Sequence, residues 1–213
     1  MLTMMFKRYR KPTQRINRTF ECIERMRSDR LRLPFAHFVM LMPYMAKETI
    51  DQLVLIHAPQ RIGNVDVPKD LQMVTFGTLV RLQGAPKDND YYKTCCALVS
   101  ELTAIPAERV GSYAAQDVLG IVNMVKSEME RIGNLFKSLQ SENSSDEIMA
   151  GIERLNFGTF GLVDWYAKRM GMTNHDEVFE TPWARIFQAM KIDHEQGEFE
   201  KRYRKVIERK TKK

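Results

Sequence analysis

The chain has little cysteine and no long hydrophobic run. Only three cysteines occur in 213 residues, and two of them, Cys95 and Cys96, are adjacent. This arrangement gives neither a disulfide framework nor metal-ligand spacing, so we expect reduced side chains packed in a core. The most apolar stretch, residues 34–50, is interrupted by Pro43 and Lys47 and cannot supply the roughly 18 apolar residues that cross a bilayer. With no secretory pattern at the N-terminus, we expect a cytoplasmic protein without membrane contact.

The sequence also lacks the motifs that carry common catalytic chemistry. It has no G-x-x-x-x-G-K-[ST] phosphate loop and no G-x-G-x-x-G turn, and His194-Glu195 is not followed by the second histidine of H-E-x-x-H. The four histidines are scattered, and carboxylates such as Asp164 and Asp176 are explained by helix caps and solvent-facing positions. We therefore predict a protein that is not an enzyme, with no cofactor, no metal and no small-molecule substrate.

Charge is distributed unevenly along the chain. Residues 1–33 carry ten Lys and Arg against three acidic residues, a net +7, and residues 193–213 carry eight against five, a net +3. Because the whole chain is +6, the middle is at −4. Basic arms of this kind contact phosphates or acidic protein surfaces, although a solvated face is the alternative for the C-terminus. The candidates for nucleic-acid or acidic-surface contact are Lys7, Arg8, Arg10, Lys11, Arg15 and Arg18.

Apolar residues recur at helical spacing through most of the chain. The segment after Pro12 places Phe20 and Ile23 on one face of a basic helix, and residues 118–136 carry a long apolar stripe. No strand alternation separates these segments, so the sequence predicts an all-α fold: an irregular helical bundle with a basic N-terminal helix and a long C-terminal helix. The predicted organisation is a basic arm over residues 1–33, a central bundle over 34–140, a polar linker over 141–150 and a helical module over 151–213.

Local signals predict several helix ends. Thr75 is expected to cap a short helix that stops at Gly84, and Gly171 should end another helix. Thr173 with Asp176 three residues later, and Thr181 followed by Pro182, are expected to start the last two helices. A final helix from Pro182 to about Arg209 would be about 40 Å long, so we expect its far end to project or to meet a partner.

The far half of this last helix carries a second apolar pattern. Its residues at i, i+4, i+7 and i+8 form a stripe with Lys201, Arg202, Arg204 and Lys205 at its flanks. We interpret the stripe as a protein contact, because interleaved carboxylates disfavour a phosphate backbone; a nucleic-acid arm is the alternative. The predicted protein-contact residues are Phe199, Tyr203, Val206 and Ile207, together with Phe20 and Ile23 of the basic helix.

The order of segments over about residues 70–205 resembles helical proteins of tailed bacteriophages that are described as tail-assembly chaperones or minor structural proteins. In these proteins a short T-x-G helix precedes a helix that ends in a Leu-x-x-Ile-Pro-x-Glu turn, and a helix entered through a polar step follows. The "DWYA" helix, the "DEV" step and the charged final helix are similar to their closing segment. The matching residues are Thr75, Gly77, Leu79, Leu82, Leu102, Ile105, Pro106, Glu108, Val110, Asp117, Leu119 and Ile121.

The resemblance implies a virion or virion-assembly protein, either a head–tail junction or tail component or a tail assembly factor. Its implied partners are other virion proteins and copies of itself, with packaged DNA contacted through the basic N-terminus. Its implied location is the host cytoplasm during assembly and then the virion. Residues 1–33 and 35–60 do not fit the pattern, and a small helical DNA-binding protein with basic terminal arms is the alternative.

Overall fold

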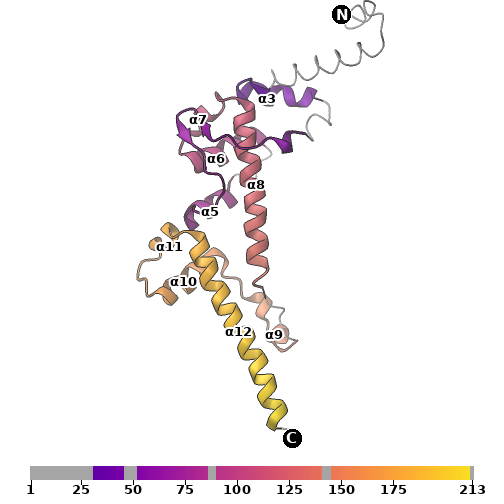
Figure 1. Ribbon diagram of the computed structural model, residues 1–213, viewed down its shortest axis with the longest axis vertical. Helices are drawn as coiled ribbons and strands as arrows, with labels where there is room; N and C mark the ends of the chain where they lie inside the picture. Colours follow the sequence, from indigo (N-terminus) through magenta and orange to yellow (C-terminus); the bar gives the residue numbers. More distant parts are fainter. Residues whose placement is uncertain (1–30, 46–51, 86–89, 141–144, 212–213) are drawn as a thin grey trace, which may run out of the picture. The chain divides into compact units, whose positions relative to one another are not determined.

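The computed structural model of the protein describes residues 31–45, 52–85, 90–140 and 145–211 (Figure 1). Within these ranges helices dominate, and the only strands are β1 (Arg61–Ile62) and β2 (Val65–Asp66), which pair antiparallel around Gly63. Gly63 has φ 57°, which suits a residue without a Cβ atom. The predicted all-α fold is confirmed. The predicted basic N-terminal helix, with all its candidate contact residues from Lys7 to Ile23, lies outside the described residues.

The chain forms two compact units. Unit 1 comprises residues 1–67 and 86–124, and unit 2 comprises residues 68–85 and 125–213. Helix α8 (Ala115–Lys137) contributes its first part to unit 1 and its second part to unit 2. This division differs from the predicted one, which ran a single bundle to residue 140, and the segment predicted as a linker contains helix α9 (Ser145–Met149).

Unit 1 has a core of large apolar side chains. Its elements are α3 (Phe35–Leu41), η2 (Met42–Tyr44), η3 (Gln52–Leu55), α6 (Tyr91–Thr103), α7 (Ala107–Val110) and the start of α8. Phe35 is fully buried and its ring stacks on Tyr92 with centroids 5.6 Å apart. Cys95 and Cys96 are buried free thiols, as the sequence predicts.

Helix α8 is held against the segment before β1 by a close backbone approach. Asn123 donates its side-chain amide to the carbonyls of Leu53 and Ile56, at 2.7 and 3.2 Å. One turn earlier, Gly120 lies directly against the backbone of His57 and Ala58. A glycine at this position therefore lets the two chain segments touch.

Unit 2 joins a short segment early in the sequence to the C-terminal helices. Its elements are α5 (Phe76–Gln83), the second part of α8, α9, η4 (Ile152–Arg154), α10 (Gly158–Met170), α11 (Asp176–Glu180) and α12 (Trp183–Thr211). The buried Trp183 indole donates to the Leu71 carbonyl at 2.6 Å, and Phe76 stacks on Phe179. These contacts connect residues more than 100 positions apart, which local composition does not reveal.

Two of the predicted helix caps are wrong and others are confirmed. The Thr75 hydroxyl accepts from the Thr78 amide at 3.2 Å, and α5 ends at Gly84 as predicted. Helix α10 ends at Gly171, which has φ 67°.

Helix α11, however, has no Thr173 cap, because the Asn174 side chain accepts the Asp176 amide instead. Among the described residues no amide of the first turn of α12 donates to the Thr181 hydroxyl: the Trp183 amide donates to the Val74 carbonyl at 3.3 Å, and the hydroxyl itself donates to the Glu177 carbonyl at 3.0 Å.

Candidate protein-contact surface

Helix α12 is buried only near its start. Its 29 residues correspond to about 43 Å, close to the predicted length and position. Its buried residues are Trp183, Ile186 and Ala189, and every residue from Phe199 to Thr211 is exposed. Phe136 of α8 packs on Trp183 and Phe187, which anchors the first two turns. The second half of α12 therefore has no cover from the described part of unit 2.

Four large apolar side chains lie exposed on this uncovered half and are called the stripe here. Phe199 is 60% exposed, Tyr203 56%, Val206 47% and Ile207 43%. The rings of Phe199 and Tyr203 stack with centroids 6.1 Å apart and an angle of 18° between their planes. The two rings lie together, and each residue remains more than half exposed.

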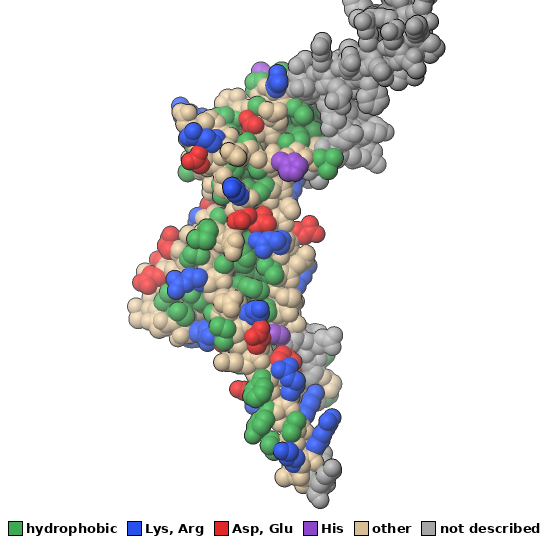
Figure 2. Space-filling model, viewed as in Figure 1, with side chains coloured by type: hydrophobic (Ala, Val, Ile, Leu, Met, Phe, Trp, Pro, Cys, Tyr) green, Lys and Arg blue, Asp and Glu red, His purple; other side chains and the backbone are tan. Residues whose placement is uncertain are grey.

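Charged residues flank the stripe, and several carboxylates are already paired within the helix. Lys201 lies 2.9 Å from Glu198, Arg204 3.8 Å from Glu200, and Lys191 3.7 Å from Glu195. The Lys201 ammonium holds the pKa of Glu198 below its ordinary value. Residues 199–211 carry six Lys and Arg against two Glu, so the surroundings of the stripe have a formal charge of +4. Figure 2 shows this mixture of hydrophobic and basic side chains along the end of α12.

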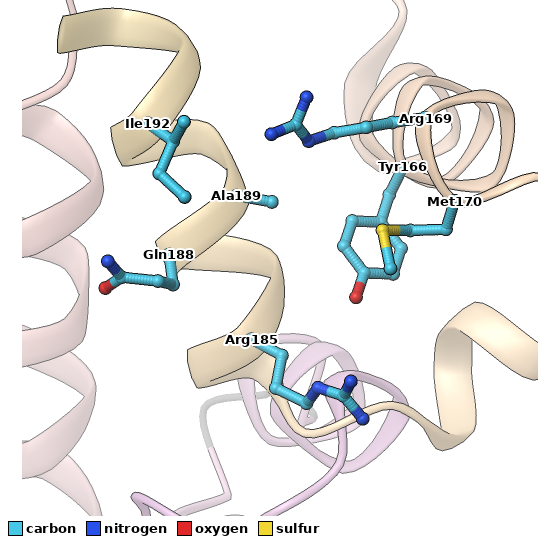
Figure 3. Close-up of a pocket in the computed structure, with 7 residues that line it drawn as sticks. All are labelled: Tyr166, Arg169, Met170, Arg185, Gln188, Ala189 and Ile192. Carbon is cyan, nitrogen blue, oxygen red and sulfur yellow. The ribbon is translucent and has the colours of Figure 1, made fainter.

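An open pocket of about 520 Å³ lies between α10 and α12. Tyr166, Arg169 and Met170 point from α10 toward α12, and Arg185 and Ala189 point from α12 into the same space (Figure 3). Arg169 is paired with Asp193 at 2.8 Å. Arg185 has no carboxylate partner among the described residues. Tyr166 is only 2% exposed, and its hydroxyl forms no hydrogen bond with another described residue.

The pocket and the stripe belong to the same face of α12. At about 100° per residue, the pocket-lining positions and the stripe positions fall within one sector of about 100°. Ile192, which lines the pocket and is 40% exposed, lies between the two. We call this continuous surface the α12 face, and its residues are Arg185, Gln188, Ala189, Ile192, Phe199, Tyr203, Val206 and Ile207.

The sequence located only the second half of this surface. The stripe is predictable from helical spacing, because its residues lie on one helix. The pocket residues Tyr166, Arg169 and Arg185 are not predictable in this way, because they come together only when α10 packs beside α12. The available hint was that Ile192 lies seven residues before Phe199, which extends the stripe backward by two turns.

The other candidate sites do not form clusters. In the described ranges no group of three or more His, Cys, Asp or Glu side chains is placed to hold a metal ion. His175 lies 3.6 Å from Asp164 and packs edge-on against Phe160. Of the helices that the structure describes, none is both long and apolar enough for a transmembrane span.

Comparison with known proteins gives no relative. No family model matches the chain, and no curated protein or solved structure matches it.

Proposed function

We propose that this chain is a non-catalytic virion or virion-assembly protein of a tailed bacteriophage, and that it acts through protein contacts made by the end of α12. Its partners would be copies of itself and other virion proteins. The phage setting rests on the resemblance of residues 70–205 described above. The mode of action rests on the stripe: four large apolar side chains, 43–60% exposed, on a helix end that the described residues leave uncovered.

A partner is the physical reason for keeping such a stripe. Single exposed apolar side chains are ordinary, but four adjoining ones on one side of a helix are typical of a helix that docks in an apolar groove. Burying the remaining exposed area of each would contribute on the order of 1 kcal/mol at about 25 cal/mol per Å². An uncovered helix end of 13 residues is also marginal in water, so a partner that covers it would stabilise the helix as well.

The test compares two sets of substitutions in the full-length chain. We expect Phe199→Ser with Tyr203→Ser to abolish assembly, measured as particle mass at micromolar concentration. Arg202→Gln, Arg204→Gln and Lys205→Gln should leave most of the assembly intact. Met73→Ser is the matched control, because Met73 is 79% exposed in unit 2 and lies outside the α12 face.

Retention on DNA, measured across a salt series, separates the alternative function. A nucleic-acid arm would lose binding when the three bases are removed, with a steep salt dependence, and would tolerate the loss of both aromatics. That pattern, or assembly that survives the double aromatic substitution, would refute the proposed protein contact.

A further inference from the structure

A second exposed apolar region lies in unit 2, at residues 145–160, and is called the acceptor segment here. It includes α9, η4 and the start of α10. Exposed large apolar side chains are unusually dense in it: Ile148 is 49% exposed, Met149 79%, Leu155 64%, Phe157 70% and Phe160 64%.

The acceptor segment has the opposite charge to the stripe. Its sequence carries Asp146, Glu147 and Glu153 against Arg154, a formal charge of −2, whereas residues 199–211 are at +4. Two stripes placed face to face would bring their cations together, which disfavours a contact between identical surfaces. A stripe against an acceptor segment buries apolar side chains on both sides and brings together segments of opposite formal charge.

The pocket end of the α12 face fits the same acidic partner. Arg185 offers a guanidinium without a carboxylate partner in the described chain, and the buried Tyr166 hydroxyl lines the same pocket. A guanidinium and a phenol hydroxyl together are donors suited to a carboxylate. The α12 face therefore combines a pocket whose donors suit a carboxylate with an apolar stripe, and the acceptor segment combines a formal charge of −2 with exposed apolar side chains.

We propose that the acceptor segment of one copy of this chain docks on the α12 face of another copy. The inference rests on the proposed function, and it identifies the surface that receives the stripe. The contact joins two different surfaces, so each copy of a pair keeps one unused surface, and the pair as a whole keeps one of each kind. Repetition of the contact produces a ring if the rotation closes and a filament if it does not.

The decisive experiment mixes two variants that each lack one surface. The donor variant is Phe199→Ser with Tyr203→Ser, and the acceptor variant is Leu155→Ser with Phe157→Ser, all at exposed positions. We expect each variant alone to associate about 100-fold or more weakly than wild type, because two central anchors are lost. An equimolar mixture should form a dimer of one copy of each and nothing larger, since only one intact pair of surfaces remains.

The substitution Arg185→Gln tests whether the pocket takes part in the contact. Arg209→Gln is the control, because it also removes one cation from α12 but lies off the α12 face. We expect about tenfold weaker association for Arg185→Gln, from the loss of a charge-assisted hydrogen bond, and about twofold or less for Arg209→Gln. Equal effects of the two would overturn the role of the pocket.

The outcomes distinguish this inference from the proposed function. If the acceptor variant assembles like wild type while the donor variant does not, the stripe meets a different surface and only this inference fails. A mixture that stays monomeric also overturns it. A wild-type chain that is a strict monomer overturns the contact between copies, including the case in which the acceptor segment covers the stripe of its own copy. Assembly that survives in the donor variant overturns the proposed function itself.

Discussion

Two glycines of α8 differ sharply in what a side chain would meet, and they provide a matched test of the packing in unit 1. A Cβ atom at Gly120 would collide with the carbonyl oxygen of His57 and lie 2.7 Å from its carbonyl carbon and 3.0 Å from the Ala58 Cα. A Cβ atom at Gly133 would meet nothing within 4 Å. Alanine is favoured over glycine in a helix by about 1 kcal/mol, so both substitutions have the same intrinsic benefit.

We expect Gly133→Ala to raise the free energy of unfolding by about 0.5–1 kcal/mol, through helix propensity. Gly120→Ala must push the backbone of residues 57 and 58 away, at a cost of about 1–3 kcal/mol. The Asn123 amide holds the Leu53 and Ile56 carbonyls one turn along, so the segment cannot retreat without weakening two hydrogen bonds, each worth about 1 kcal/mol. The displaced backbone and the two weakened hydrogen bonds together cost about 3–5 kcal/mol, so after the propensity gain of about 1 kcal/mol is subtracted, Gly120→Ala should lower the free energy of unfolding by about 2–4 kcal/mol.

Urea unfolding followed by circular dichroism measures both variants, and hydrogen exchange shows where the loss occurs. We expect faster exchange in α6 and the first part of α8 for Gly120→Ala, and no such change for Gly133→Ala. If Gly120→Ala is as stable as wild type, the close approach of residues 57 and 58 to α8 does not exist, and the description of this part of unit 1 is wrong.

Three further predictions concern unit 2. The side-chain hydrogen bonds from Arg131, and then the one from the Leu71 amide, lower the pKa of Glu128 below its ordinary 4.5, although burial acts in the opposite direction. The ionised Glu128 therefore stabilises the fold fully above pH 4.5. This stabilisation is lost as the pH falls through the lowered pKa. Thermal unfolding of Glu128→Gln should show a loss of about 1 kcal/mol at pH 7 that shrinks steadily as the pH is lowered below 4.5, and a gap that stays constant over that acid range would contradict this assignment. Trp183→Phe should cost about 1 kcal/mol in chemical denaturation, since the Leu71 carbonyl loses the indole and keeps only the Val74 amide at 3.3 Å; a neutral result would show that the indole is not hydrogen-bonded. Thr75→Ala should cost about 1 kcal/mol of unfolding free energy and Thr173→Ala close to none, and the reverse order would restore Thr173 as the cap.

Local chemistry predicted some helix ends and missed others for an identifiable reason. Thr75 is the residue whose side chain caps the start of α5, and Gly84 is the residue at which α5 ends. No neighbouring cap residue competes with either, so the preference of each residue decides the boundary. Thr173 competes with Asn174, whose longer side chain reaches the Asp176 amide. Thr181 lies where one helix ends and the next begins, and its hydroxyl bonds to the earlier one. Where two cap residues are close together, propensity alone does not select between them.

Which segments make up unit 2 depends on contacts that sequence spacing does not encode. The hydrogen bond from Trp183 to Leu71 joins residues 112 positions apart, and it brings residues 68–85 to the C-terminal helices rather than to their neighbours in sequence. The all-α class required only the apolar period of each segment, so it was predictable. The pocket residues Tyr166 and Arg185 were not, because each is unremarkable on its own helix.

The carboxylates near the stripe carry less weight in the choice of partner than their number suggests. Glu195, Glu198 and Glu200 each pair with a cation on the same helix, and this pairing partly neutralises their charge toward any ligand. The apolar side chains therefore decide the question. A phosphate backbone gains nothing from covering Val206 and Ile207, and Phe199 and Tyr203 stack on each other, which leaves less ring surface for a base to stack on. An acidic, apolar protein surface can bury the stripe and also pair with the basic residues that flank it. The chemistry of α12 therefore favours a protein partner over a nucleic acid.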